Sequence, residues 1–440
     1  MLWILLSLLA GENLAFGKTY PWSLLPGSLG RVLWLALTGL FVIGLLGEIL
    51  PGFGGVRRWT QGGLNPLRRS FQSRAILIVL VCMSGAFALW NYFKFRPMGY
   101  TFPVGSLVLC LAFLPWVKRE RTGWLVVFNL GMLACSIVQF PLNLFRSDMV
   151  LVIKNALDAW WIQKDPYLPQ VLECGATGMP YFPGILFSHF PAWFLGLDLR
   201  WNQFVYRAVY MGILWRLSKK LAPQSLVRDG INFYLANPYL MFRHDLYFEI
   251  YPFLIALYFM VPRLRSLWIP VLAITSQWCC VLVPFLWLRE VYESSQQTRV
   301  SRIIQLVLMA LIVFALVFWL LASSTTVSSF LASAFFVVRG ESAFYSGDYG
   351  ISLGYLGELV NGKRLFLLLQ VGAFFLFLLK DFLEQRQGIK KTGLNSSLAL
   401  VFFTLFAMHF WIYFWLFSMI WILFVVIEEE RSQEPHISPR

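Results

Sequence analysis

The chain has 440 residues and a formal net charge of +14, and it is 58% hydrophobic but only 13% charged. An ordinary soluble domain carries about 25% charged residues, so the composition excludes a soluble globular enzyme and predicts an all-α, polytopic membrane protein. The positive charge does not indicate a nucleic-acid partner. The Lys and Arg residues fall in short clusters between apolar runs, as in loops on the cytoplasmic side of a membrane.

Apolar runs recur along the whole chain. A crossing takes about 20 apolar residues, and on this basis we predict about 11 to 14 membrane-spanning helices. The candidate spans are 1–16, 31–50, 75–91, 102–117, 124–145, 203–218, 230–243, 247–262, 267–288, 303–322, 364–380 and 396–427. The run 267–288 is either one span or two half-helices around Gln277, and 396–427 is either one tilted span or two short ones. The run 1–16 lacks the basic start and cleavage site of a signal peptide, so we expect a retained helix.

Basic clusters orient these spans, because loops rich in Lys and Arg stay in the cytoplasm. Clusters at 57–74 and 118–121 place the loop 146–202 outside, and the next cluster, at 216–228, is inside. This leaves no crossing for the run 181–197. Since that run is short and contains prolines, we expect it to form a juxtamembrane or re-entrant helix.

Three regions follow from this order of spans. Residues 1–123 are predicted to form extra N-terminal transmembrane helices, and 124–300 form a core that includes the first outer loop. Residues 301–440 form C-terminal spans with a second long outer loop, 323–363. Within the core, arginines beyond both ends of 267–288 lie inside, which favours two half-helices over one span.

A polar island interrupts the apolar runs in the first outer loop: it begins with Arg146-Ser147-Asp148, continues as an amphipathic stretch and ends with Asp165-Pro166-Tyr167. The amphipathic residues 149–161 place apolar side chains at helical spacing with Lys154 and Asp158 on the other side, which predicts a helix lying in the membrane interface. Asp148 stands at its beginning, where a carboxylate caps free N–H groups. The alternative is a functional role, because carboxylates are costly near a bilayer and mark function where they occur.

A second polar group, Arg243-His244-Asp245, lies where a predicted span meets the outer surface, and Glu249 follows one helical turn later. On a functional interpretation, Asp245 and Glu249 hold the acceptor or, together with Asp148, a divalent cation. On a structural interpretation they are interface residues, with Arg243 bonded to Asp245. Because hard cations take about six to eight oxygen ligands, we assign no metal site, and the divalent cation is only a candidate cofactor.

Four basic residues near the outer surface are candidates for binding a lipid phosphate: Lys154, Lys164, Arg207 and Arg243. For each of them the alternative is a charged group that reaches the interface from an apolar stem. His189 and His409 lie among aromatic residues, and we expect hydrogen-bonded core histidines rather than ligands. The loop 323–363 either folds over an acceptor or forms a plain surface loop.

Several of these residues follow one another in a recognisable order. Asp148 is followed by Asp165-Pro166-Tyr167, Tyr181-Phe182-Pro183, Gly196 and Arg207, and later by Asn237-Pro238 and His244-Asp245. This order resembles the membrane glycosyltransferases of the GT-C fold, above all the polyprenol-phosphate-mannose-type transferases, over residues 124–300. The chain departs from that pattern at Lys164 and Gly184, where the family has Gly and a second Pro, and at Gln277, where a Lys is often found.

The resemblance implies a glycosyltransferase that moves a mannose-like hexose or a pentose from a polyprenyl phosphate to an outward-facing glycan, lipid or protein acceptor. Its place would be the outer face of a bacterial inner membrane, where nucleotide sugars are absent. Asp148 would be the general base, Asp165 and Tyr167 would shape the loop or contact substrate, and Asp245 would help to bind the acceptor. A basic residue would neutralise the phosphate as it leaves.

Two other classes of function stay open. A polysaccharide polymerase or ligase that uses diphosphate-linked glycans requires basic catalytic residues in the loop 323–363. A flippase or other transporter requires charged residues at mid-membrane and repeat symmetry, whereas the acidic residues of this chain lie at the ends of predicted spans.

Overall fold

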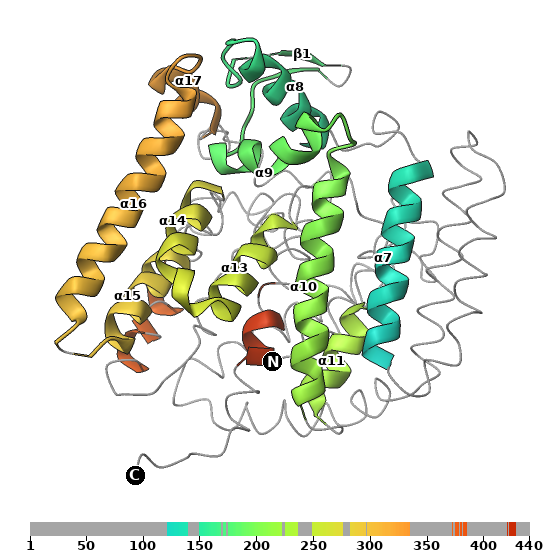
Figure 1. The fold of residues 1–440 in the computed structure, drawn as a ribbon, viewed down its shortest axis with the longest axis vertical. Coiled ribbons are helices and arrows are strands. Elements are labelled where there is room, and N and C mark those ends of the chain that lie inside the picture. The colour runs from blue at the N-terminus through green and yellow to red at the C-terminus, as the bar shows by residue number, and fades with distance from the viewer. Residues whose placement is uncertain are drawn as a thin grey trace, which may run out of the picture.

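The computed structural model describes residues 121–139, 149–168, 170–172, 175–221, 225–235, 249–275, 282–295 and 297–334, together with short helical pieces within 372–384 and 420–427. The predicted spans before residue 121, and almost all of those after residue 334, lie outside this part, as do Gln277 and His409. The described part is helical apart from one short β-hairpin (Figure 1), in agreement with the predicted helical class.

Three long helices and several shorter ones form the body of the part that the structure describes. The long helices are α7 (Arg121–Gln139), α10 (Arg200–Lys220) and α16 (Arg299–Leu321), and the shorter ones are α11 (Leu226–Leu235), α13 (Ile250–Met260), η3 (Pro262–Leu264), α14 (Arg265–Thr275) and α15 (Val283–Glu293). α10 packs against α7 on one side and α13 on the other, and α14 joins α13 to α16. Tyr210, Met211 and Ile255 are fully buried along α10 and α13.

The run 267–288 forms two short helices rather than one continuous span. α14 ends at Thr275 and α15 begins at Val283. Arg265, the first residue of α14, and Glu293, the last residue of α15, form an ion pair of 3.2 Å. The two helices therefore return to the same end of the molecule, as the arginine pattern of the sequence favoured.

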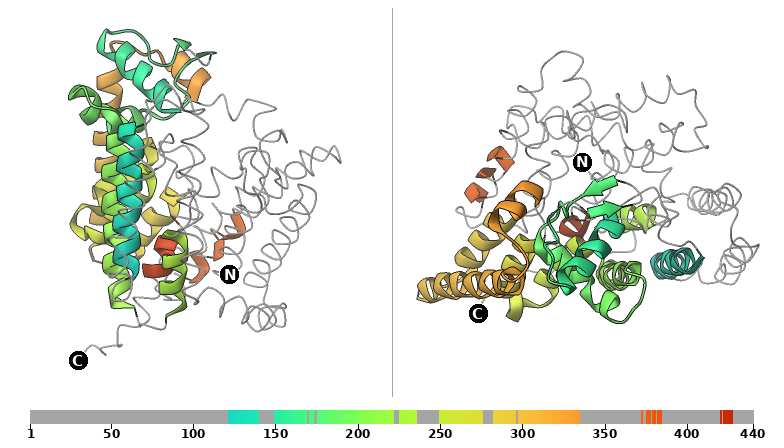
Figure 2. Two further views of the ribbon diagram at one scale, coloured as in Figure 1. Left: turned by 90° about the vertical axis from the view of Figure 1, so that its right-hand side faces the viewer. Right: turned by 90° about the horizontal axis from the view of Figure 1, so that it is seen from above.

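A layer of short elements, here called the upper layer, lies at the upper end of the described helices in Figure 1, and the side view in Figure 2 agrees. It consists of α8 (Met149–Trp161), strands β1 (Gln170–Leu172) and β2 (Gly175–Thr177), α9 (Pro183–Phe194) and α17 (Val327–Ala334). The two strands are antiparallel, with Val171 opposite Ala176. Trp160 joins the layer to α16, because its Nε1 donates to the backbone oxygen of Leu320 at 3.0 Å.

α8 covers the predicted helix 149–161 and packs on α9. Ile153 and Leu157, from the predicted apolar face, are buried, and Lys154 lies on the exposed side. Trp161 belongs to the apolar pattern but is 58% exposed, a difference that follows from its place as the last residue of the helix.

α9 is too short to cross a bilayer. Its 12 residues extend for about 18 Å, whereas the hydrocarbon core is about 30 Å thick. It begins at Pro183, whose fixed φ suits the first helical turn. It ends at Phe194, and two residues later Gly196 adopts a φ of +67°. The backbone N of Leu197 closes the turn by donating to the backbone oxygen of Ala192 at 2.8 Å. This agrees with the prediction that 181–197 is not a span.

Among the described helices, α16 alone is by itself long and apolar enough to cross a membrane. α13 and η3–α14 reach that standard only as a pair, and the pair bends by 109°. Only 17% of the apolar stretch of α16 is buried, and Leu311 and Trp319 are 60% and 73% exposed. The multi-pass topology stays a prediction.

Candidate functional site

The predicted site residues divide into those that the structure describes and those that it does not. Asp148, Arg243, His244 and Asp245 lie outside the described residues. Lys154, Lys164, Asp165 and Tyr167 lie in the upper layer, and Arg207 and Glu249 lie in the helices beneath it. The six described residues therefore gather toward one end of the molecule.

Asp165 connects the first predicted outer loop to the beginning of α17. Its Oδ1 accepts a hydrogen bond from the backbone N of Tyr167 at 2.9 Å, a local turn that aspartate side chains commonly form. Its Oδ2 accepts hydrogen bonds from the backbone N of Thr326 at 3.3 Å and from the hydroxyl of Ser329. The carboxylate thus caps the first turn of a helix that begins more than 150 residues later, an arrangement that shapes the loop.

Tyr167 lies buried beneath this turn, with 2% of its surface exposed. Its ring meets Phe330 of α17 edge-on, with ring centroids 5.2 Å apart. Burial, and to a lesser extent the charge of Asp165, raises the pKa of the Tyr167 hydroxyl, which has no hydrogen-bond partner among the described residues. Ser333 donates to the backbone oxygen of Met179 at 2.8 Å, so α17 is attached to the chain on both sides of the hairpin.

Lys154 lies beside an open groove of about 650 Å³ between α8 and the turn that links α9 to α10. The groove is lined mainly by apolar side chains, and its charged residues are Lys154 and Asp198. Lys154 Nζ is 2.9 Å from Asp158 Oδ2, and Asp158 Oδ1 accepts a hydrogen bond from Trp193 at 2.7 Å. A half-exposed ion pair of this kind contributes little stability, so the ammonium can exchange its partner for a ligand. Lys164 is exposed beyond the end of α8.

Arg207 and Glu249 form a buried ion pair between α10 and the start of α13. Arg207 Nε donates to Glu249 Oε1 at 2.9 Å, and Nη2 bonds to the same oxygen. The backbone N of Glu249 donates to Gln203 Oε1 at 3.2 Å, and the amide nitrogen of Gln203 meets Nε2 of His189 in α9. We call His189, Gln203, Arg207 and Glu249 the upper polar chain.

His189 is neutral in this chain of contacts. Complete burial lowers its pKa to about 4, against the opposing effect of its bond to the backbone oxygen of Ile185. Its Nδ1 donates to that oxygen at 2.9 Å, so Nε2 is left to accept from Gln203, a tautomer assigned from the network. The backbone oxygen of His189 accepts from Asn202 at 2.8 Å. These contacts agree with the expected hydrogen-bonded core histidine.

The pairing changes the interpretation of Arg207 and Glu249. The sequence suggested contacts with donor phosphate and acceptor, but the two charges neutralise each other, and neither residue lines the groove. Because a buried pair that loses one partner leaves an uncompensated charge, we interpret both as positioning residues that fix α9, α10 and α13. Glu249 Oε2 has no hydrogen-bond partner among the described residues.

Two residues of this site, Gln203 and Trp193, were not identified from the sequence. Gln203, which contacts His189 and Glu249, lies one helical turn before Arg207. A polar pair at that spacing in an apolar run is a local signal for a buried polar face. Trp193 and Asp158 are 35 residues apart, and no periodic pattern links residues on two different helices.

The described residues include no group of three or more His, Cys, Asp or Glu side chains placed to hold a metal ion. In this part of the chain the candidate site consists of the groove beside α8, the loop fixed by Asp165 and the upper polar chain. No known protein family, characterised protein or solved structure matches the chain.

Proposed function

We propose that the protein is a multi-pass membrane glycosyltransferase that moves a mannose-like hexose or a pentose from a polyprenyl phosphate to an acceptor outside the cell membrane. The groove beside α8 is the observation that carries this proposal. Its apolar walls suit a lipid tail, and the ammonium of Lys154 suits the phosphate at the end of that tail. α8 begins at Met149, directly after Asp148.

The surface of α16 supports the membrane part of the proposal. Its 23 residues extend for about 34 Å, enough for a hydrocarbon core of about 30 Å. Leu308, Leu311 and Phe318 are among many large apolar side chains that it exposes. Soluble proteins rarely expose an apolar surface of this extent, whereas lipid solvates it without cost.

The distribution of charge supports the orientation. The end of the molecule opposite the upper layer carries Lys219 and Lys220 at the end of α10, Arg263 in η3, and Arg299 and Arg302 at the start of α16. Lys and Arg residues next to membrane spans favour the cytoplasmic side. The upper layer would then face outward, where the sugar donors are linked to lipids.

In the proposed reaction, Asp148 takes the proton of the acceptor hydroxyl while the hydroxyl oxygen bonds to C1 of the sugar. The bond between C1 and the phosphate oxygen breaks, and polyprenyl phosphate leaves with both electrons of that bond. Lys154 and Lys164 are described cations of the upper layer that can neutralise the leaving phosphate. Arg243 is a further candidate for this role, and the adjoining His244 and Asp245 would bind the acceptor.

The donor assignment is tested with purified protein in liposomes. The liposomes receive either a labelled polyprenyl-phosphate sugar or a labelled nucleotide sugar, together with an acceptor-bearing membrane extract, and protein-free liposomes are the control. We expect a new glycosidic bond from the lipid-linked sugar alone. Transfer from the nucleotide sugar without added polyprenyl phosphate would refute the assignment. Movement of lipid-linked glycan across the bilayer without a new bond would replace it with a flippase.

A further inference from the structure

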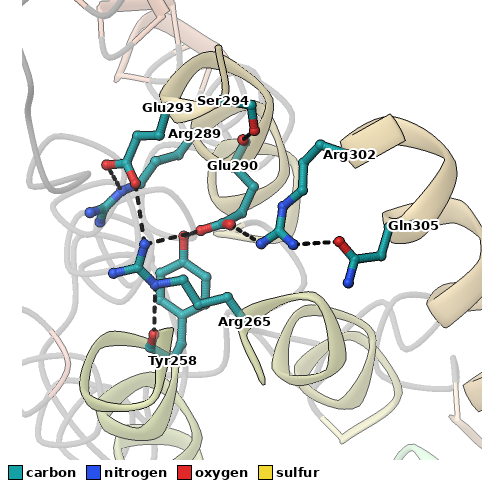
Figure 3. Close-up of polar contacts among 8 residues, drawn as sticks. All are labelled: Tyr258, Arg265, Arg289, Glu290, Glu293, Ser294, Arg302 and Gln305. Carbon is teal, nitrogen blue, oxygen red and sulfur yellow. Dashed lines mark hydrogen bonds and ion pairs between the residues drawn. The ribbon is translucent and has the colours of Figure 1, made fainter. Parts of the chain in front are cut away.

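A cluster of arginine side chains joins the lower ends of α13, α14, α15 and α16 (Figure 3). The cluster lies at the end of the molecule opposite the upper layer, and the proposed reaction makes no use of it. We call Tyr258, Arg265, Arg289, Glu290, Glu293 and Arg302 the lower arginine cluster.

Two glutamates connect the three arginines. Glu293 accepts from Arg289 Nε at 2.8 Å through Oε1 and from Arg265 Nη1 at 3.2 Å through Oε2. Glu290 pairs with Arg302 and lies 3.5 Å from Arg265 Nη1. These ion pairs hold the ends of three helices together, as the dashed lines in Figure 3 show.

The cluster carries an excess of positive charge, because three guanidinium groups face two carboxylates. The excess is most marked at Arg289, which is 1% exposed and whose Nη1 and Nη2 have no hydrogen-bond partner among the described residues. The rings of Phe259 and Tyr258 lie 5.1 and 5.9 Å from its guanidinium carbon. Ring faces attract a cation, but they do not replace hydrogen-bond acceptors for buried N–H groups.

We propose that the lower arginine cluster binds a phosphate-class anion, with the two Nη groups of Arg289 as its principal donors. A guanidinium presents parallel N–H groups that match two oxygens of a phosphate. Glu293 is 34% exposed and Arg265 15% exposed at their side chains. Since the Glu293 carboxylate contacts both Arg265 and Arg289, an anion that takes the place of this carboxylate meets two guanidinium groups.

Two sources of the phosphate fit this chemistry: an anionic phospholipid headgroup and a small soluble phosphate. Basic pockets between helices on the cytoplasmic side of a membrane suit lipid phosphates, and the proposed orientation places the cluster on that side. Only the lipid source rests on the proposed membrane placement. Binding of the anion depends in no way on glycosyl transfer.

The alternative is an ion-pair network that does nothing except connect helix ends. The two accounts give opposite expectations for Glu293→Gln. In a purely structural network this substitution removes two ion pairs and creates no binding. In an anion site it removes a competing negative charge beside Arg289 and strengthens binding.

The experiment measures binding to the full-length protein in detergent, by native mass spectrometry and by the shift in melting temperature. The probes are phosphatidylglycerol, the zwitterionic phosphatidylcholine and soluble glycerol phosphate. The variants are Arg289→Met and Glu293→Gln, with Arg263→Met as the matched control, because Arg263 is an exposed arginine at the same end outside the cluster.

We expect saturable binding of phosphatidylglycerol that is at least about tenfold weaker in Arg289→Met, severalfold stronger in Glu293→Gln, and unchanged within about twofold in Arg263→Met. Glycerol phosphate that binds with the same dependence on the variants would assign the soluble source. If the affinity for every probe is the same in Arg289→Met and Glu293→Gln as in the wild type, the proposal is overturned. If Arg289→Met does not fold, the test rests on Glu293→Gln alone. The proposal is then overturned if Glu293→Gln does not bind phosphatidylglycerol more strongly than the wild type. Because the readout is binding, either result leaves the proposed transfer reaction to its own test.

Discussion

Gly184 lies in α9 directly against α14, and its replacement by alanine tests how the upper layer packs on the helices below. A Cβ at this position would lie 2.4 Å from Thr275 Oγ1, 2.7 Å from Thr275 Cα and 2.9 Å from the backbone oxygen of Ile274. Two of these three atoms belong to the backbone of α14, so a side-chain rotation cannot make room. In Gly184→Ala, α9 must therefore move away from α14.

The expected cost follows from two opposing effects. Overpacking costs about 1 to 3 kcal/mol, and alanine is better than glycine within a helix by about 0.5 to 1 kcal/mol. The net loss of unfolding free energy in Gly184→Ala then lies between about 0 and 2.5 kcal/mol. Gly212→Ala is the matched control, because a Cβ at Gly212 in α10 would meet no atom within 4 Å. This variant should keep only the helical gain.

The assay is thermal unfolding of the purified proteins in one detergent, followed by tryptophan fluorescence. We expect the melting temperature of Gly184→Ala to fall below that of the wild type, and that of Gly212→Ala to equal or exceed it. Equal melting temperatures for the two variants would refute the close contact between α9 and α14.

Three further predictions concern the upper polar chain and the topology. Arg207→Met leaves Glu249 as a buried unpaired charge and should lower the free energy of unfolding by about 3 to 5 kcal/mol. The double variant Arg207→Met/Glu249→Leu should recover most of this loss. Equal losses of unfolding free energy in the single and double variants would count against the ion pair. His189 is neutral in the folded protein, so only the unfolded state binds a proton at this side chain as the pH falls from about 6.5 to about 4. The free energy of unfolding should therefore fall in that window by about 1 kcal/mol per pH unit. If His189→Gln has the same pH dependence as the wild type, this prediction is wrong. Cys174, which lies outside the described residues in the predicted outer loop, should react with an impermeant thiol reagent on intact cells, and labelling only after permeabilisation would invert the topology.

Local patterns in the sequence were sufficient for the elements that surround the site. Helical spacing of apolar residues predicted the helix 149–161, and the structure has α8 over the same residues. Prolines, length and the balance of basic clusters predicted that 181–197 is not a span, and α9 is a short helix there. Each of these signals lies within a few turns of the residues that it describes, which is why the sequence alone was informative.

The contacts that define the candidate site could not be predicted in this way. Arg207 and Glu249 are 42 residues apart, and Asp165 is 161 residues from Thr326. These pairs form because separate helices pack beside each other, and packing depends on side-chain shapes from distant parts of the chain. The sequence marked Arg207, Glu249 and Asp165 as unusual polar residues, but it did not indicate that their partners lie within the protein.

The central claim is that Asp148 is the general base of a transferase that uses a lipid-phosphate sugar. The most direct measurement is the rate of sugar transfer by the Asp148→Asn variant in liposomes supplied with a polyprenyl-phosphate sugar. Asparagine keeps the shape of aspartate and caps helices equally well, so the melting temperature should change little. Loss of the base should lower the rate by about 100-fold or more. A rate close to that of the wild type would contradict the claim and leave Asp148 as the cap of α8.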